Sequence, residues 1–226
     1  MFSVIWLSLR SSKLPCCLQR LLVNPVQQTS RLYRKRSPTR SLTDEELREV
    51  SRALGRWEDQ RRPGPRASTD MRDIVDLMLA TGARIGEILA LRWQEIDLEA
   101  EPPRLTITGT IKTETGKGTF RKDSPKSDAS VRTLALPAFG VRLLRRRLRN
   151  RQDSPVDAVF PTRNGTWQQV TNVERRWREI RRGTPIEWVT PHTFRKTVAT
   201  LIAQSVGAET ASQQLGHSFP DVTREF

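Results

Sequence analysis

The sequence is poor in the residues that build disulfide and metal scaffolds. Its 226 residues include two cysteines, the neighbours Cys16 and Cys17, which cannot easily bridge each other or complete a four-ligand zinc site. It also lacks any uninterrupted apolar run near the ~20 residues that cross a bilayer. These absences argue against a disulfide-rich fold, structural zinc and a helical membrane protein, and they predict a protein of the reducing cytoplasm.

Tyrosine and histidine are also scarce. The chain has one tyrosine, Tyr33, and two histidines, His192 and His217. Chemistry that needs a phenol or an imidazole therefore has few residues available to it.

Acidic residues are outnumbered by basic ones. The chain has 39 lysines and arginines against 25 acidic residues, a formal net charge of +14, which predicts a polyanionic partner. Eight of the basic residues lie within residues 1–40, where no acidic residue occurs. Residues 24–43 are polar and basic and contain two prolines, so we expect a linker or extended arm that gives way to a folded domain near Ser41.

Beyond that boundary, apolar residues recur at helical and strand spacings. A first helix is expected from Thr43, a second is expected to stop at Thr81 and Gly82, and a third to continue to Trp93. Two alternating segments joined through Gly116 and Gly118 predict antiparallel strands. The strands are expected over 104–111 and 130–136, and further helices over 138–151, 171–182, 191–204 and 208–215. This order predicts an α+β fold, mostly α-helical, with one small antiparallel sheet.

Three short segments can carry chemistry. In TGARIGEILALRW, residues 81–93, Arg84 opens a helix and Glu87 follows one turn later on the same face. Such an arginine can bind a phosphate, but for an isolated helix a surface ion pair between Arg84 and Glu87 is the commoner meaning. In PHTFRKTVATLI, residues 191–202, His192 and Arg195 are spaced i, i+3 near a helix N-terminus, which suits anionic oxygens or is simply a solvated face.

The third segment is QQLGHS, residues 213–218, which places His217 just after a helix that ends at Gly216. A single histidine in such a position is usually structural. In combination and in this order, the three segments resemble the tyrosine recombinase family of phage-type integrases. Its catalytic domain carries an A-R-x-G-E turn, an H-x-x-R helix start and an L-G-H segment.

The resemblance covers roughly residues 41–226 and implies the fold of the DNA breaking-rejoining enzymes. It implies that residues 41–226 are the catalytic domain without its C-terminal end, and that residues 1–40 are a basic arm left from a missing core-binding domain. The implied partner is double-stranded DNA. No metal or other cofactor is expected, because the family conserves bond energy in a covalent phosphotyrosine link.

The resemblance also implies a role for each matching residue. Two arginines, Arg84 and Arg195, would clamp the nonbridging oxygens of the phosphate. A lysine near the leaving 5′ oxygen would act as general acid, and PKSDASVRTLALP, residues 125–137, points to Lys126. His192 and His217 would donate hydrogen bonds to the phosphate or accept the proton of the nucleophile, and Glu87 would be a supporting residue. Three other lysines compete with Lys126 for its role, namely Lys112, Lys117 and Lys122.

The sequence departs from the family where the nucleophile is expected. Family members place a tyrosine roughly ten residues after the L-G-H segment, whereas this sequence reads SFPDVTREF to Phe226. A phenylalanine has no hydroxyl oxygen to attack phosphorus. Tyr33 lies in the basic linker, outside any motif. We therefore expect a truncated catalytic domain that is inactive alone, and a monomer, because the segment that docks on a neighbouring protomer is missing.

Three functional interpretations stay open at this point. The chain can belong to a recombinase that integrates or excises DNA, it can be a non-catalytic DNA-binding module, or it can be an inert fragment. The run RLLRRRLRNR, residues 142–151, does not decide between them. Its arginines either bind phosphates or form a solvated helical face, the interpretation we slightly favour, with Val141, Leu144 and Leu148 turned to the core. Three tryptophans, Trp167, Trp177 and Trp188, are expected to pack in the core.

Overall fold

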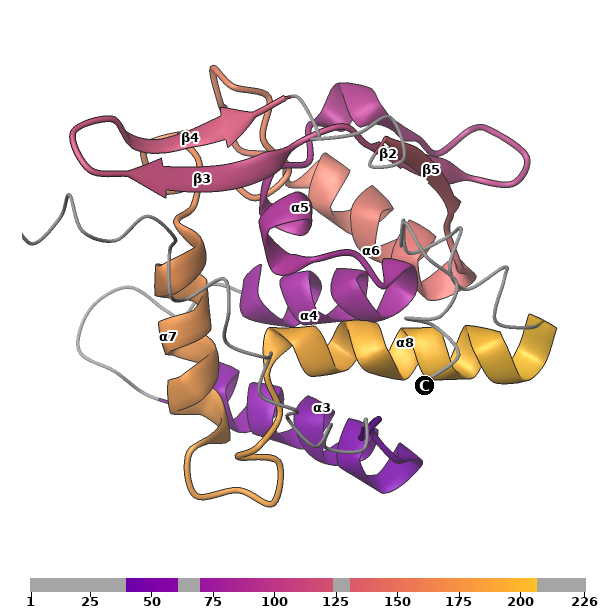
Figure 1. Ribbon diagram of the computed structural model, residues 1–226. Helices are drawn as coiled ribbons and strands as arrows, with labels where there is room; N and C mark the ends of the chain where they lie inside the picture. The colour runs from indigo at the N-terminus through magenta and orange to yellow at the C-terminus, as the bar shows by residue number, and fades with distance from the viewer. Residues whose placement is uncertain (1–39, 61–69, 124–130, 207–226) are drawn as a thin grey trace, which may run out of the picture. The chain divides into compact units, whose positions relative to one another are not determined.

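The computed structural model describes residues 40–60, 70–123 and 131–206, which form helices with short strands between them (Figure 1). In chain order the elements are α3 (Asp44–Asp59), α4 (Asp70–Thr81), α5 (Ile85–Leu89), the 3₁₀ helix η2 (Trp93–Glu95), β1 (Ile96–Asp97), β2 (Arg104–Ile107), β3 (Thr110–Glu114), β4 (Gly118–Lys122), β5 (Arg132–Ala135), α6 (Ala138–Arg149), α7 (Val170–Arg181) and α8 (Pro191–Val206). This order confirms the expected α+β fold. The predicted helix over 208–215 lies outside the described residues.

Helix α4 lies at the centre of the core. It contacts α3, α5, α6, α7 and α8, and it runs beside α8 in Figure 1. Most residues of α4 are buried, and most of the buried ones are apolar, which is typical of a central helix. The buried ones include Ile74, Leu77 and Met78. Because α4 ends at Thr81 as predicted, the next residues leave it from the middle of the fold.

The start of α3 follows its sequence signals. The side chain of Thr43 accepts a hydrogen bond from the backbone N–H of Glu46, and the Glu46 carboxylate accepts one from the backbone N–H of Thr43. This capping box satisfies backbone donors that the first helical turn leaves free. One residue earlier, the buried backbone N–H of Leu42 donates to the Thr197 hydroxyl at 2.9 Å, which fixes the start of α3 against α8.

The third predicted helix is shorter than expected. We predicted a helix that continues to Trp93, but α5 ends at Leu89 and a separate 3₁₀ helix begins at Trp93. Tertiary hydrogen bonds explain the difference. The carbonyl of Ala90 accepts from Arg121 Nε at 2.8 Å, and the backbone N–H of Trp93 donates to the carbonyl of Asp157 at 3.1 Å. These groups therefore pair with other parts of the chain instead of continuing the helix.

The predicted strand over 104–111 divides into two. Strand β2 pairs antiparallel with β1 and β5, whereas β3 pairs with β4 in a separate hairpin. The turn of this hairpin has positive φ angles of 83° at Gly116 and 73° at Gly118, so these glycines turn the chain as predicted. The turn leads into β4, a strand that we did not predict, and not to the strand expected over 130–136. The chain changes sheet at Gly109, where a Cβ would lie 2.6 Å from the guanidinium carbon of Arg121. The described residues thus contain two small antiparallel sheets rather than one.

The C-terminal end of α6 packs differently from the prediction. Leu144 is buried as expected, but Leu148 is 44% exposed. The inward position is taken by Arg147, whose guanidinium lies 4.3 Å from the centroid of the Phe160 ring. The tryptophans pack as predicted: Trp177 is buried against Phe194, and Trp167 and Trp188 are partly buried against the core.

Candidate functional site

Arg84 lies in the connection between α4 and α5. Helix α4 ends at Thr81, and the next residue, Gly82, has a φ of +65°, which suits a glycine just past the end of a helix. Arg84 then takes the N-cap position of α5, and its side chain is 53% exposed. The sequence correctly predicted Arg84 at a helix start.

Glu87 holds Arg84 in two ways. Its Oε2 accepts the backbone N–H of Arg84 at 2.8 Å, and its Oε1 accepts Nη1 of the Arg84 side chain at 2.9 Å. A further guanidinium, that of Arg132, donates to Oε2 at 2.7 Å. Burial acts to raise the pKa of Glu87, but the two arginines outweigh it and hold the pKa below its usual value. Glu87 is therefore an ionised carboxylate shared by two arginines.

Arg195 is buried beside this pair. Its side chain comes from α8, only 2% of the residue is exposed, and Nη1 donates to the carbonyl of Gly82 at 2.9 Å. Burial, together with the like charges of Arg84 and Arg132, lowers the pKa of Arg195 to about 9, and Glu87 opposes the shift. Arg195 is still a cation at neutral pH. Three guanidinium groups near one carboxylate leave an excess of positive charge, which favours a bound anion.

His192 is an exposed residue in the first turn of α8, one helical turn before Arg195. Partial burial and the positive charges of Lys196, Arg195 and Arg84 lower its pKa. The imidazole is therefore neutral at neutral pH, a form that can donate one hydrogen bond and accept one proton. The structure brings together Arg84 and Glu87, from the start of α5, and Arg195 of α8. The charges of both arginines act on His192.

Residues 41–226 match the Phage integrase family. The chain belongs to this family. Among its relatives, a XerC-like tyrosine recombinase of Caldanaerobacter subterraneus subsp. tengcongensis is 28% identical over 202 residues, covering 81% of this chain and 48% of the relative. The integrase of Staphylococcus phage L54a is 28% identical over 154 residues, covering 63% of this chain and 43% of that protein. The chain thus spans about half the length of these curated relatives.

Solved structures share the integrase fold. The Tn1549 transposon integrase, in a complex with circular intermediate DNA, matches with a TM-score of 0.69 and 17% identity over 94% of this chain and 70% of that one. The XerA recombinase matches with a TM-score of 0.62 and 22% identity over 87% of this chain and 61% of that one. These likenesses agree with the predicted fold type of the DNA breaking-rejoining enzymes.

Two predicted site residues, Lys126 and His217, lie outside the described part of this integrase-family chain. The competitors of Lys126 all lie on the exposed β3–β4 hairpin. Lys112 is on β3, Lys122 ends β4, and Lys117 in the turn pairs with Glu114 at 3.1 Å. The choice among the four lysines therefore stays a prediction.

Our sequence reasoning did not find Arg132. The residue opens β5, and only 8% of its surface is exposed. A signal was present, because strand alternation places Arg132 on the same face as the buried Leu134 and Leu136. A charged residue on the core face of a strand requires a buried partner of opposite charge.

Sequence reasoning also missed Arg121 of β4, whose side chain is 3% exposed. Its guanidinium donates to Ala90, to Thr108 at 2.6 Å and to Glu95 at 2.5 Å. These bonds fix the β3–β4 hairpin to the segment that follows α5. Arg121 therefore positions the hairpin lysines relative to the turn that carries Arg84.

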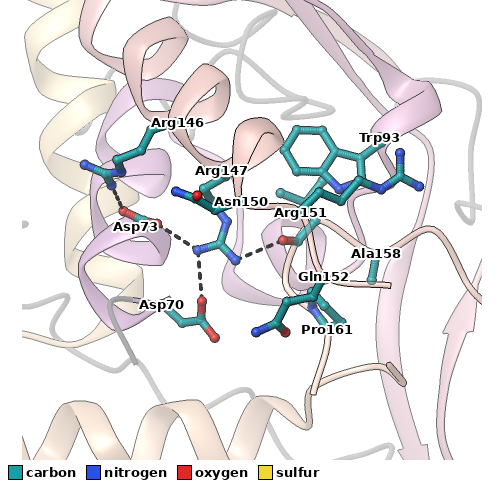
Figure 2. Close-up of a pocket in the computed structure, with 11 residues that line it drawn as sticks. Asp70, Asp73, Trp93, Arg146, Arg147, Asn150, Arg151, Gln152, Ala158 and Pro161 are labelled. Carbon is teal, nitrogen blue, oxygen red and sulfur yellow. Dashed lines mark hydrogen bonds and ion pairs between the residues drawn. The ribbon is translucent and has the colours of Figure 1, made fainter. Parts of the chain in front are cut away.

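The hollow in Figure 2 contains none of the predicted site residues. It measures about 200 Å³, and two aspartates of α4 line it with arginines of α6. Arg147 Nη1 lies 2.9 Å from Asp70 and 2.7 Å from Asp73, and Arg146 also pairs with Asp73. These ion pairs join α4 to α6, so the predicted solvated face is wrong for Arg147, which is 14% exposed.

Within residues 40–60, 70–123 and 131–206, no three His, Cys, Asp or Glu side chains are grouped so that they could hold a metal ion. In the same ranges, no helix is both long enough and apolar enough to span a membrane.

Proposed function

We propose that this chain binds double-stranded DNA and holds one backbone phosphodiester between Arg84 and Arg195. The observation that carries the proposal is the group of three arginines around one carboxylate, Glu87, with the guanidinium of Arg84 open to solvent. The excess positive charge of this group favours a bound anion. A phosphodiester is the anion that DNA presents along its whole length.

The two arginines are held in place before any ligand binds. Arg195 is fixed by the carbonyl of Gly82, and Arg84 is fixed by Glu87. Planar guanidinium groups present several donors in a fixed geometry that matches phosphate oxygens. Donors that are already oriented stabilise developing negative charge without reorganisation, as phosphoryl transfer requires.

His192 adds a neutral imidazole beside the arginines. It would donate a hydrogen bond to a phosphate oxygen or accept a proton from an attacking hydroxyl. We expect Lys126 to act as the general acid and His217 to donate a hydrogen bond to the phosphate. Membership of the integrase family supports a role in DNA recombination and integration for the protein to which these residues belong.

Strand cleavage is a separate step that needs a nucleophile. The single tyrosine of the 226 residues is Tyr33, which lies outside the motifs that match the family. We therefore expect these residues to hold the phosphodiester without forming a phosphotyrosine. The alternative, an inert fragment, predicts neither a stable fold nor DNA binding.

Fluorescence anisotropy with a labelled duplex tests whether the arginine site carries the binding. Arg84→Gln should weaken binding about tenfold or more, because it removes charge-assisted hydrogen bonds to the phosphate. Arg48→Gln is the matched control, because Arg48 pairs with Glu45 on the exposed face of α3. This substitution removes the same charge as Arg84→Gln. Arg195→Lys should weaken binding as well, with circular dichroism to verify folding.

The losses of DNA affinity in Arg84→Gln and Arg48→Gln are compared to separate binding at this site from binding by net charge. Equal losses for Arg84→Gln and Arg48→Gln would mean that the net charge of the chain, rather than this site, binds DNA. No binding by a folded wild-type protein would contradict the proposal itself.

A further inference from the structure

Arg132 is buried at the start of β5, close to the residues of the proposed phosphate site. Its side chain is 7% exposed, and it pairs with Glu87, whose side chain is 9% exposed. Both terminal nitrogens of Arg132 donate to the Glu87 carboxylate, so we do not expect this guanidinium to bind a DNA backbone as the exposed Arg84 does. Any effect on DNA binding has to pass through a neighbouring side chain.

Arg132 and Arg84 share both oxygens of the Glu87 carboxylate. Oε2 accepts from Arg132 Nη2 at 2.7 Å and from the backbone N–H of Arg84 at 2.8 Å. Oε1 accepts from Arg132 Nη1 at 3.4 Å and from Arg84 Nη1 at 2.9 Å. A carboxylate held at both oxygens has one orientation, and that orientation sets the direction of the Arg84 guanidinium.

Arg132 also keeps Glu87 in its ionised form. Burial acts to raise the pKa of Glu87, and the hydrogen bond and charge of Arg132 act most strongly against it. Without Arg132, the buried carboxylate would lose a fixed donor and its main counter-charge. The Arg84 side chain, more than half exposed, would then sample other directions.

We infer that Arg132 is a positioning residue for phosphodiester binding, acting through Glu87 on Arg84. This inference rests on the proposed function, because it assumes that Arg84 binds the phosphate. It adds a third arginine to the site, one that holds the strand β5 and the Arg84 turn in a fixed relation. No direct contact between Arg132 and DNA is part of it.

A double-mutant cycle tests the inference with the labelled duplex. Arg132→Gln should weaken binding about tenfold when Arg84 is present, the size of coupling expected within one ion-pair network. In an Arg84→Gln background, the same substitution should change binding by less than about twofold, because the residue it positions is gone. A purely structural or long-range electrostatic role would weaken binding equally in both backgrounds.

Two further variants separate positioning from folding. Arg132→Lys keeps a positive charge that can donate to one Glu87 oxygen, so it should recover part of the affinity lost in Arg132→Gln. Arg72→Gln is the matched control, because Arg72 is a largely buried arginine paired with Glu58 rather than with a residue of the phosphate site. It should lower the melting temperature but leave the affinity near that of the wild type.

The outcomes distinguish the inference from the function on which it rests. If Arg84→Gln weakens binding and Arg132→Gln is additive with it, the inference is wrong and the proposed function stands. If Arg84→Gln itself leaves binding unchanged, the proposed function fails first. If Arg132→Gln does not fold, Arg132→Lys takes its place in the cycle. The loss of DNA affinity that Arg132→Lys causes should then also disappear in the Arg84→Gln background.

Discussion

At the scale of single residues, Glu87 joins two arginines that are far apart in the sequence. Sequence spacing predicted its pairing with Arg84, because residues at i and i+3 meet on one face of a helix. The pairing with Arg132, across 45 residues, could not be predicted in this way. It depends on how β5 lies beside α5, which no local pattern encodes. The same holds for Arg121 and Ala90, 31 residues apart.

The pKa of His192 predicts how DNA binding depends on pH. The pKa lies below the ordinary 6.5 in the free protein, and a bound phosphate would raise it, so the complex takes up a proton. Affinity should therefore increase as the pH falls from 7.5 to 5.5, by about three- to tenfold for one charge-assisted hydrogen bond. His192→Asn should remove this increase. A wild-type affinity that is constant over this range would contradict the prediction.

Asp76 of α4 makes folding sensitive to pH away from the site. Burial, with the charge of Asp73, raises the pKa of Asp76 to about 6 from 3.8, although Arg72 and Arg146 oppose the shift. Because the folded pKa is the higher one, ionisation of Asp76 costs stability above pH 6, and the cost disappears below 3.8. Asp76→Asn should be more stable than the wild type by about 1–3 kcal/mol at pH 7.5.

Urea unfolding at pH 7.5 and 4.5 measures this difference, which should be smaller at the lower pH because part of the cost is lost between pH 6 and 3.8. Glu99→Gln provides a control, since Glu99 is exposed and a surface carboxylate contributes little at either pH. A stability gain of Asp76→Asn that is the same at both pH values would contradict the assignment.

At the scale of elements, the sequence predicted most helices within a few residues. Caps, glycines and apolar spacing determined α3, α4, α6, α7 and α8. The errors fall where tertiary contacts override local preference. Helix α5 ends early because Arg121 takes the carbonyl of Ala90, and the predicted strand breaks near Gly109 because the Arg121 guanidinium occupies the space beside it.

The contact of α5 with β3 requires a residue without a side chain at position 86. A Cβ on Gly86 would lie 2.8 Å from Thr110 Oγ1, so one of the two elements has to move. Gly86→Ala should destabilise the protein by about 1–3 kcal/mol, the usual cost of overpacking. Adding Thr110→Ser should recover part of the loss, because a serine hydroxyl can turn away. Gly55→Ala is the control, with its nearest neighbour at 3.6 Å, and should be neutral or stabilising.

Thermal unfolding monitored by circular dichroism measures these changes. Equal destabilisation by Gly86→Ala and by the double variant would show that Thr110 is not the group that the added methyl meets.

At the scale of the whole molecule, one hydrophobic core extends from Leu42 to Phe194 and includes residues of the helices and of both small sheets. A single core of this kind predicts one cooperative unfolding transition. It also predicts a folded protein rather than an inert fragment. Differential scanning calorimetry checks the first point, and a broad transition without a heat-absorption peak would contradict it.

The net charge of +14 predicts strong salt dependence of DNA binding. The logarithm of the affinity should fall linearly with the logarithm of the salt concentration, with a slope near −0.9 for each phosphate that the protein neutralises. The most direct measurement combines native and denaturing gel electrophoresis of one set of samples that contain labelled, nicked duplex DNA. We predict a salt-sensitive shift in the native gel that Arg84→Gln weakens, and no protein–DNA adduct in the denaturing gel. A covalent adduct, or a shift that does not respond to Arg84→Gln, would contradict a phosphate site that binds DNA without cleaving it.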